Sequence, residues 1–174
     1  FLLLIIVYLL SKLNILHFKY FFLTAAFSSI LISLDIIYQF ILGFNIIGLE
    51  SGGRYNRFNS GFFGDEFIAG GFIQRFSFFA VFFTILLFKN KDYTNYISTI
   101  IIVCVLGAGI LLSGNRMPLI LFVFGLFLVF FSNLKIKKIL FVSLVALFIL
   151  LQFIISYDKR YESVYLGLIA KTKN

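Results

Sequence analysis

Residues 96–132 read YISTIIIVCVLGAGILLSGNRMPLILFVFGLFLVFFS, two apolar runs joined by a short polar turn. Each run, 96–112 and 118–132, is somewhat shorter than the roughly 20 apolar residues that a membrane-spanning helix needs. The serine or the asparagine of the turn can cap the second helix, and Pro118 suits its first turn. This stretch therefore predicts a pair of tilted or closely packed membrane helices with Arg116 at the connection.

The rest of the chain has the same apolar character. Hydrophobic residues make up 61% of the 174, and the mean hydropathy is +1.07. Further apolar runs at 20–42, 67–88 and 139–156 are long enough, or nearly so, to span a bilayer. Because backbone polar groups facing lipid must be satisfied within the protein, we expect an all-α polytopic transmembrane bundle of about five full spans.

We expect residues 1–174 to form a single membrane domain that is a fragment of a larger chain. The opening run 1–10 is too short to cross a bilayer alone and is interpreted as the tail of a truncated span. No charged segment precedes it, so it is not interpreted as a signal peptide. The last residues, Lys173 and Asn174, do not end on a closing feature.

The composition argues against several functional classes. Cys104 is the only cysteine and His17 the only histidine, so no internal disulfide and no metal cluster are expected. We expect no cofactor. The formal net charge of +8 is interpreted as loop charge beside anionic lipid, with the bilayer as a partner and no nucleic acid.

The distribution of lysine and arginine predicts which way the chain faces. Three alternating connections are rich in lysine and share one side: 11–19, 89–95 and 133–138, with Lys12, Lys19, Lys89, Lys91, Lys135, Lys137 and Lys138. Short lysine-rich loops lie in the cytoplasm. The connections 43–66 and 113–117 and the tail from residue 157 then face outward. These outward segments hold Arg54, Arg57 and Arg116.

Loop 43–66 is the most unusual connection, because it is long and contains six glycines and several aromatic residues. Loops of this length between helices are usually functional or disordered. Its aromatic residues argue against a merely flexible hydrophilic loop. Asp65 and Glu66 stand where the next helix should begin, as expected at the positive end of a helix dipole.

Two arginines are candidates for anion binding or for structural roles. Arg116 lies near a helix N-terminus, where backbone N–H groups and a guanidinium suit an anion, although it could also anchor to lipid headgroups. Arg75 lies deeper, about 14 Å into its run at about 1.5 Å per residue. A charge at that depth needs a partner. Asp35, at a similar depth, predicts an ion pair with Arg75 that is either structural or functional.

Two short segments together carry a resemblance to a known family. Residues 57–65, RFNSGFFGD, and residues 112–116, LSGNR, resemble motifs of the O-antigen ligase and O-antigen polymerase superfamily. Members carry an arginine followed shortly by G-x-F-G before one helix, and an S-G-x-R turn two helices later, on the periplasmic side. The resemblance covers about residues 20–156, and its motifs are short.

The resemblance implies a glycosyltransferase of lipopolysaccharide biosynthesis, multi-pass in the bacterial inner (cytoplasmic) membrane. It would move a glycan from a polyprenyl diphosphate to a lipid-A core acceptor or to another repeat unit, without a metal. Loop 43–66 would be periplasmic, and residues 157–174 would begin a periplasmic segment. Arg116 is the catalytic candidate and Arg57 a substrate-binding one by motif, with Arg54 and Arg75 added by position.

The chain departs from the family pattern in its histidine. Family members use a histidine in a large periplasmic loop as general base, whereas His17 lies in an expected cytoplasmic loop. The resemblance therefore implies a base that this chain does not supply. Two alternatives stay open. One is a transporter or flippase subunit for an anionic lipid-linked substrate, which predicts inverted repeats. The other is a non-catalytic structural membrane subunit whose arginines are interfacial anchors.

Overall fold

The computed structural model describes residue 12 and residues 18–50, 59–64, 66, 68–87, 92–132 and 137–165. Within these residues the chain forms six α-helices and one short 3-10 helix, and the predicted all-α fold is confirmed. In chain order the elements are α2 (Phe18–Leu42), η1 (Gly61–Phe63), α3 (Ala69–Leu87), α4 (Asp92–Leu112), α5 (Arg116–Ser132), α6 (Lys137–Tyr157) and α7 (Lys159–Tyr165).

The five apolar runs expected to be helical all form helices, with ends displaced by a few residues from the expected ones. Two of the described helices are long and apolar enough to cross a membrane, along Tyr20–Leu42 and Leu140–Tyr157. The apolar parts of α4 and α5, Ile97–Leu112 and Arg116–Val129, are shorter. Helix α7 lies in the tail, where the sequence indicates only the start of an outward segment.

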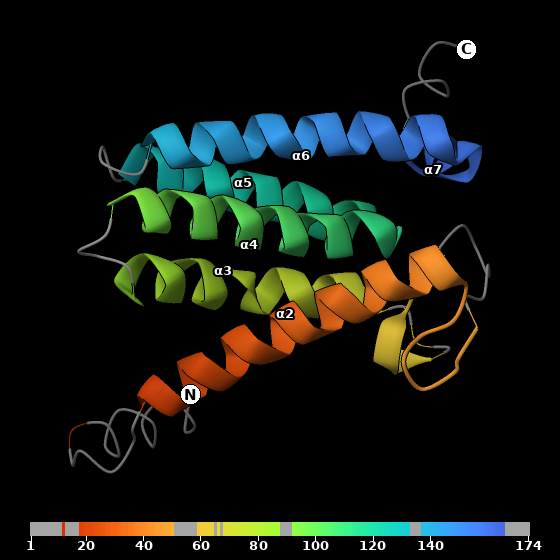
Figure 1. Ribbon diagram of the computed structural model, residues 1–174, viewed down its shortest axis with the longest axis horizontal. Helices are drawn as coiled ribbons and strands as arrows, with labels where there is room; N and C mark the ends of the chain where they lie inside the picture. The colour runs from red at the N-terminus through yellow and green to blue at the C-terminus, as the bar shows by residue number, and fades with distance from the viewer. Residues whose placement is uncertain are drawn as a thin grey trace.

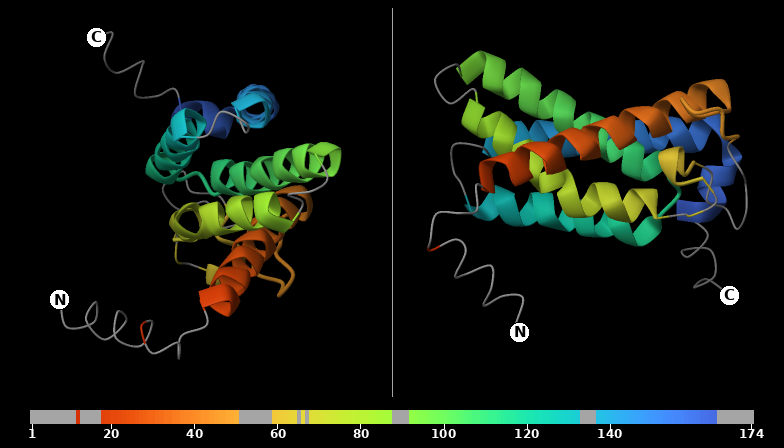
Figure 2. Two further views of the ribbon diagram at one scale, coloured as in Figure 1. Left: turned by 90° about the vertical axis from the view of Figure 1, so that its left-hand side faces the viewer. Right: turned by 90° about the horizontal axis from the view of Figure 1, so that it is seen from below.

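The helices pack in three layers (Figure 1; Figure 2). Helices α3 and α4 form the middle layer, α2 covers one side of it, and α5 and α6 cover the other. Helix α4 contacts all four of the other long helices and carries many of the fully buried apolar side chains, among them Val103, Leu106 and Ile110. It is therefore the central helix of the bundle.

Small residues allow the helices to approach closely. A Cβ atom at Gly109 of α4 would lie 2.9 Å from the Cα atom of Ser33 on α2. Gly107 of α4 and Gly125 of α5 meet the side chains of Leu147 and Phe78 in the same way. Small residues at helix contacts are typical of bundles in which van der Waals packing holds the helices together.

Some hydroxyl groups inside the bundle find their partners within their own helices. The hydroxyl groups of Ser33 and Thr84 donate to the carbonyl oxygens of Ser29 and Ala80, four residues earlier in the same helices, at 2.8 and 2.7 Å. Many large apolar side chains of α2, α5 and α6 are instead exposed on the outside. This combination suits a bundle whose outer surface faces an apolar environment.

The connections gather at two ends of the bundle. At one end lie the described parts of residues 43–66, the turn 113–115 and α7, and we call it the Arg116 end (Figure 1). The start of α6, with Lys137, lies at the opposite end. The described parts of the connections that the sequence predicts to face outward thus share one end of the molecule.

Candidate functional site

Arg116 is the first residue of α5 and follows directly on the turn that ends α4. The hydroxyl of Ser113 donates to the carbonyl of Ile110 at 2.7 Å, so Ser113 closes α4 and does not cap α5 through this bond. The carbonyl of Asn115 accepts the N–H of Leu119 at 3.4 Å, which makes Asn115 the residue from which α5 starts. The guanidinium therefore stands beside a helix N-terminus, as the sequence predicted.

Asn59 brings the two motif segments together. Its side-chain Nδ2 donates to the carbonyl of Leu112 at 2.8 Å and to the hydroxyl oxygen of Tyr161 at 3.0 Å. The Tyr161 hydroxyl itself donates to the Leu112 carbonyl at 3.1 Å. Both side chains are buried. The segment that includes Asn59, the end of α4 and helix α7 thus meet at a single carbonyl, four residues before Arg116.

A second tyrosine of α7 reinforces this junction. The hydroxyl of Tyr165 donates to the carbonyl of Leu111 at 2.6 Å, and its ring stacks on that of Tyr161 with 6.5 Å between the centroids. Burial raises the pKa of Tyr165 and the neighbouring Tyr161 adds to this effect, while Arg116 lowers it. The hydroxyl therefore keeps its proton, and so its donor role, throughout the physiological pH range.

The guanidinium of Arg116 lies against α7. Its Nη2 donates to the carbonyl of Ser163 at 3.3 Å, and the side chain is half-buried. A guanidinium has five N–H donors in a planar fork. One weak bond to a carbonyl leaves most of that donor capacity available to an anionic oxygen.

The expected ion pair between Asp35 and Arg75 is absent from the described part of the chain. Asp35 is fully buried, and its Oδ1 accepts the N–H of Ile46 at 3.0 Å. Its Oδ2 has no hydrogen-bond partner among the described groups and lies against Gly61. Arg75 is exposed. Loop 43–50 folds back on the last turns of α2, and its Ile46 N–H is the donor that meets the carboxylate.

Two amides tie the same loop to η1. The side chain of Gln39 accepts the N–H of Gly61 at 2.9 Å and donates to the carbonyl of Leu49 at 3.2 Å. Asn45 donates to the carbonyl of Gly61 at 2.8 Å and accepts the N–H of Leu49 at 2.7 Å. The described parts of loop 43–66 are therefore fixed on α2 by side-chain hydrogen bonds.

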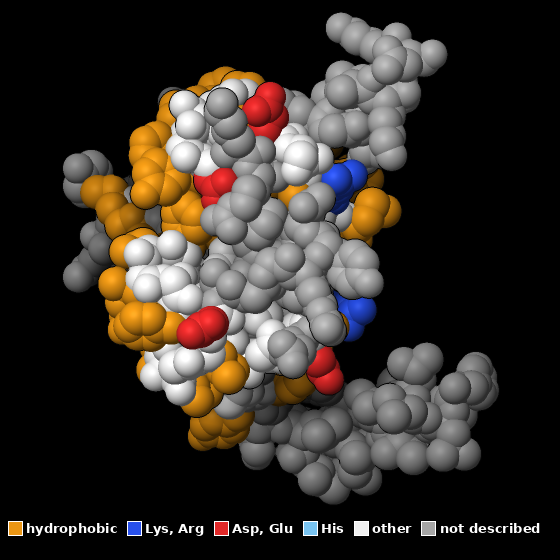
Figure 3. Space-filling model, turned by 90° about the vertical axis from the view of Figure 1, so that its right-hand side faces the viewer, with side chains coloured by type: hydrophobic (Ala, Val, Ile, Leu, Met, Phe, Trp, Pro, Cys, Tyr) orange, Lys and Arg blue, Asp and Glu red, His pale blue; other side chains and the backbone are white. Residues whose placement is uncertain are grey.

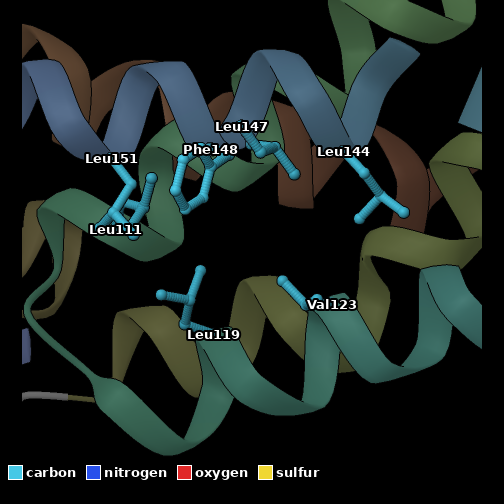
Figure 4. A pocket seen from close by; sticks show the side chains of 7 residues that line it. All are labelled: Leu111, Leu119, Val123, Leu144, Leu147, Phe148 and Leu151. Carbon is cyan, nitrogen blue, oxygen red and sulfur yellow. The ribbon is translucent and has the colours of Figure 1, made fainter. Parts of the chain in front are cut away.

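An apolar cavity of about 130 Å³ lies between α5 and α6. Figure 4 shows side chains from both helices and from the end of α4 pointing into it: Leu111, Leu119, Val123, Leu144, Leu147, Phe148 and Leu151. Leu119 lies one helical turn after Arg116, and the Leu111 carbonyl is the one that Tyr165 holds. The apolar lining thus begins one helical turn after Arg116 along α5.

The face of the molecule at the Arg116 end is mixed in character. Figure 3 shows acidic and basic side chains on this face, with hydrophobic side chains around much of its margin. Glu50, Glu66 and Glu162 are exposed residues of the segments that meet here. The described side chains include no group of three or more His, Cys, Asp or Glu residues that could hold a metal ion.

Several predicted site residues are not part of this junction among the residues that the structure describes. Arg54 and Arg57, with His17, lie outside the described residues. Arg75 lies on the outer surface of α3. The sequence analysis did not identify Tyr161 and Tyr165. Their spacing of four residues, which puts both on one face of a helix, was the signal that could have found them. Comparison of the chain with protein-family models, with curated proteins and with solved structures found no match.

Proposed function

We propose that this chain is part of a polytopic membrane glycan transferase of the O-antigen ligase and polymerase type, with about five spans. The observation that carries the proposal is the 2.8 Å hydrogen bond from Asn59 to the carbonyl of Leu112. It places the two segments of the resemblance side by side, with Arg116 at their junction. The helices could have formed without any contact between these two segments.

Arg116 has the chemistry that a diphosphate requires. A planar guanidinium donates two parallel hydrogen bonds to phosphate oxygens, and the free N–H groups at the start of α5 favour negative charge. In the proposed reaction a hydroxyl oxygen of the acceptor bonds to the anomeric carbon of the glycan. The bond from that carbon to the diphosphate oxygen breaks, and the diphosphate keeps the electron pair. Arg116 stabilises this leaving charge, and the hydroxyl proton passes to a general base, which the resemblance places in a large periplasmic loop.

An apolar surface suited to the lipid part of the donor begins one helical turn after Arg116 along α5. The cavity between α5 and α6 is lined by apolar side chains of these two helices and of Leu111 at the end of α4. Burying hydrocarbon against such a lining is favourable because it removes apolar surface from water. We propose that the prenyl chain enters between these helices while its diphosphate lies at Arg116, at the periplasmic face of the inner membrane.

The decisive assay is glycan transfer from a polyprenyl-diphosphate donor by the full-length protein in proteoliposomes. Arg116→Ala should lower the transfer rate by about 100-fold or more, the scale for removing a group that stabilises transition-state charge. Arg116→Lys should also lose most activity, because an ammonium is a point charge without the planar fork. Lys137→Ala, at the opposite end, is the matched control and should transfer at the wild-type rate.

Two results would reject the proposal. One is transfer at the wild-type rate by both Arg116→Ala and Arg57→Ala, which would leave the arginines as interfacial anchors. The other is normal transport of the lipid-linked glycan across the bilayer with no transfer by the wild-type protein, which would favour a flippase.

A further inference from the structure

Helix α7 folds back onto the Arg116 end immediately after α6. The chain turns at Asp158, whose N–H donates to the carbonyl of Ile154 at 3.0 Å and whose carbonyl accepts the N–H of Tyr161 at 3.0 Å. Tyr161 and Val164 are buried, which seats one face of this short helix on the bundle. The rings of Tyr161 and Phe40 contact edge to face, with 6.1 Å between centroids.

The seated face presents two hydroxyl groups to the end of α4. Tyr165 and Tyr161 donate to the carbonyls of Leu111 and Leu112 at 2.6 and 3.1 Å. Carbonyls in the last turn of a helix have no partner within that helix. The Leu111 carbonyl also accepts the N–H of Gly114 at 3.1 Å, and the Leu112 carbonyl the Asn59 amide. The two tyrosines add to each carbonyl a bond from a segment about 50 residues further along the chain.

The same helix also contacts the arginine. After Leu112 the chain turns through Gly114, whose φ of +69° is a conformation suited to glycine, and reaches Arg116. The Arg116 guanidinium then donates to the carbonyl of Ser163, between the two tyrosines. Helix α7 thus holds the backbone before the turn and the side chain after it.

We propose that Tyr161 and Tyr165 are positioning residues, which orient the Arg116 guanidinium by fixing the end of α4 against α7. The proposal rests on the proposed function, in which Arg116 binds a diphosphate. A planar donor fork binds phosphate well only in a narrow range of directions. Removing either hydroxyl breaks one of the two bonds that join the end of α4 to α7. The Leu112 carbonyl then keeps only the Asn59 amide, or the Leu111 carbonyl only the N–H of Gly114, so the turn before Arg116 is held less firmly against α7.

The test is binding of farnesyl diphosphate to the full-length protein in nanodiscs. Tyr161→Phe and Tyr165→Phe remove only the hydroxyl oxygen and keep the stacked rings. We expect each to weaken binding by about 3- to 10-fold, the range for one net hydrogen bond. Tyr157→Phe is the matched control, because Tyr157 lies at the same end but is 74% exposed and its ring contacts do not use the hydroxyl. Its affinity should be unchanged.

An Arg116→Lys background separates positioning from general stability. An ammonium needs no fixed plane, so Tyr165→Phe should change the affinity less than about 2-fold when Lys replaces Arg116. An equal loss in both backgrounds would overturn the proposal, because the tyrosine would then support the fold without orienting the arginine. Thermal unfolding of each variant shows whether the variant has folded. If only one of the two tyrosine variants folds, the binding affinity of that variant alone tests the proposal.

The two proposals fail in different ways. If Arg116→Ala binds farnesyl diphosphate like the wild type, the proposed function fails. If Arg116→Ala loses binding while both tyrosine variants keep the wild-type affinity, the proposed function stands and the positioning role is wrong.

Discussion

Asp35 and Gly61 touch at the end of α2, where a Cβ atom at Gly61 would lie 2.9 Å from Oδ2 of Asp35. Gly61 also has a φ of +56°, which disfavours any residue with a side chain. The carboxylate belongs to α2 and the glycine to η1, which are not adjacent in the sequence. Because of this contact the buried Asp35 faces η1. The sequence had predicted Arg75 as its partner, from the similar estimated depth of the two residues in the membrane.

Replacement of Gly61 by alanine should therefore destabilise the protein. We expect Gly61→Ala to cost about 1–3 kcal/mol, from backbone strain together with the clash against Asp35, and to lower the thermal midpoint in detergent. Gly48→Ala is the matched control, since Gly48 has a φ of +90° but nothing within 4 Å of its Cβ position. The stability lost by Gly48→Ala should reflect backbone strain alone. A Gly48→Ala loss as large as that of Gly61→Ala would show that the Asp35 contact does not matter.

The contact of α2 with α4 depends on Gly109. Gly109→Ala should separate the two helices, because its Cβ atom would lie 2.8 Å from the Cβ atom of Ser33. Overpacking of this kind costs about 1–3 kcal/mol. Gly71→Ala, in α3 with nothing within 4 Å, should be neutral or stabilise by up to about 1 kcal/mol. Thermal unfolding of the two variants measures both effects, and a Gly109→Ala midpoint at or above that of Gly71→Ala would contradict the packing.

The orientation of the bundle can be tested with single cysteines in a Cys104→Ala background. Ile47 is 66% exposed at the Arg116 end, and Lys137 begins α6 at the opposite end. In spheroplasts an impermeant thiol reagent should label Ile47→Cys, while Lys137→Cys should react only after permeabilisation. The lysine-rich connections are expected to face the cytoplasm. Labelling of both positions in intact spheroplasts would refute a membrane between these two ends.

The positions of the helices follow from the sequence because each apolar run is bounded by polar or glycine-containing connections. Runs of this length form helices, since only a helix satisfies every backbone group within one segment. Short connections then force neighbouring helices to run in opposite directions. The two ends of the bundle, and the placement of Arg116 at one of them, could be predicted without any tertiary information.

The distant partners of the polar side chains were decided by the tertiary structure alone. Asn59 bonds to Tyr161 across 102 residues, and Tyr165 bonds to Leu111 across 54. Helices that are apolar on nearly every side carry no polar stripe that sets their rotation, so the sequence does not show which way Asp35 or Arg75 points. The sequence by itself determined where the helices lie along the chain, because that depends on local apolar runs. Only packing of the whole chain decided that Asp35 meets a folded loop and that α7 closes over the turn before Arg116, because those contacts depend on how each helix is rotated against its neighbours.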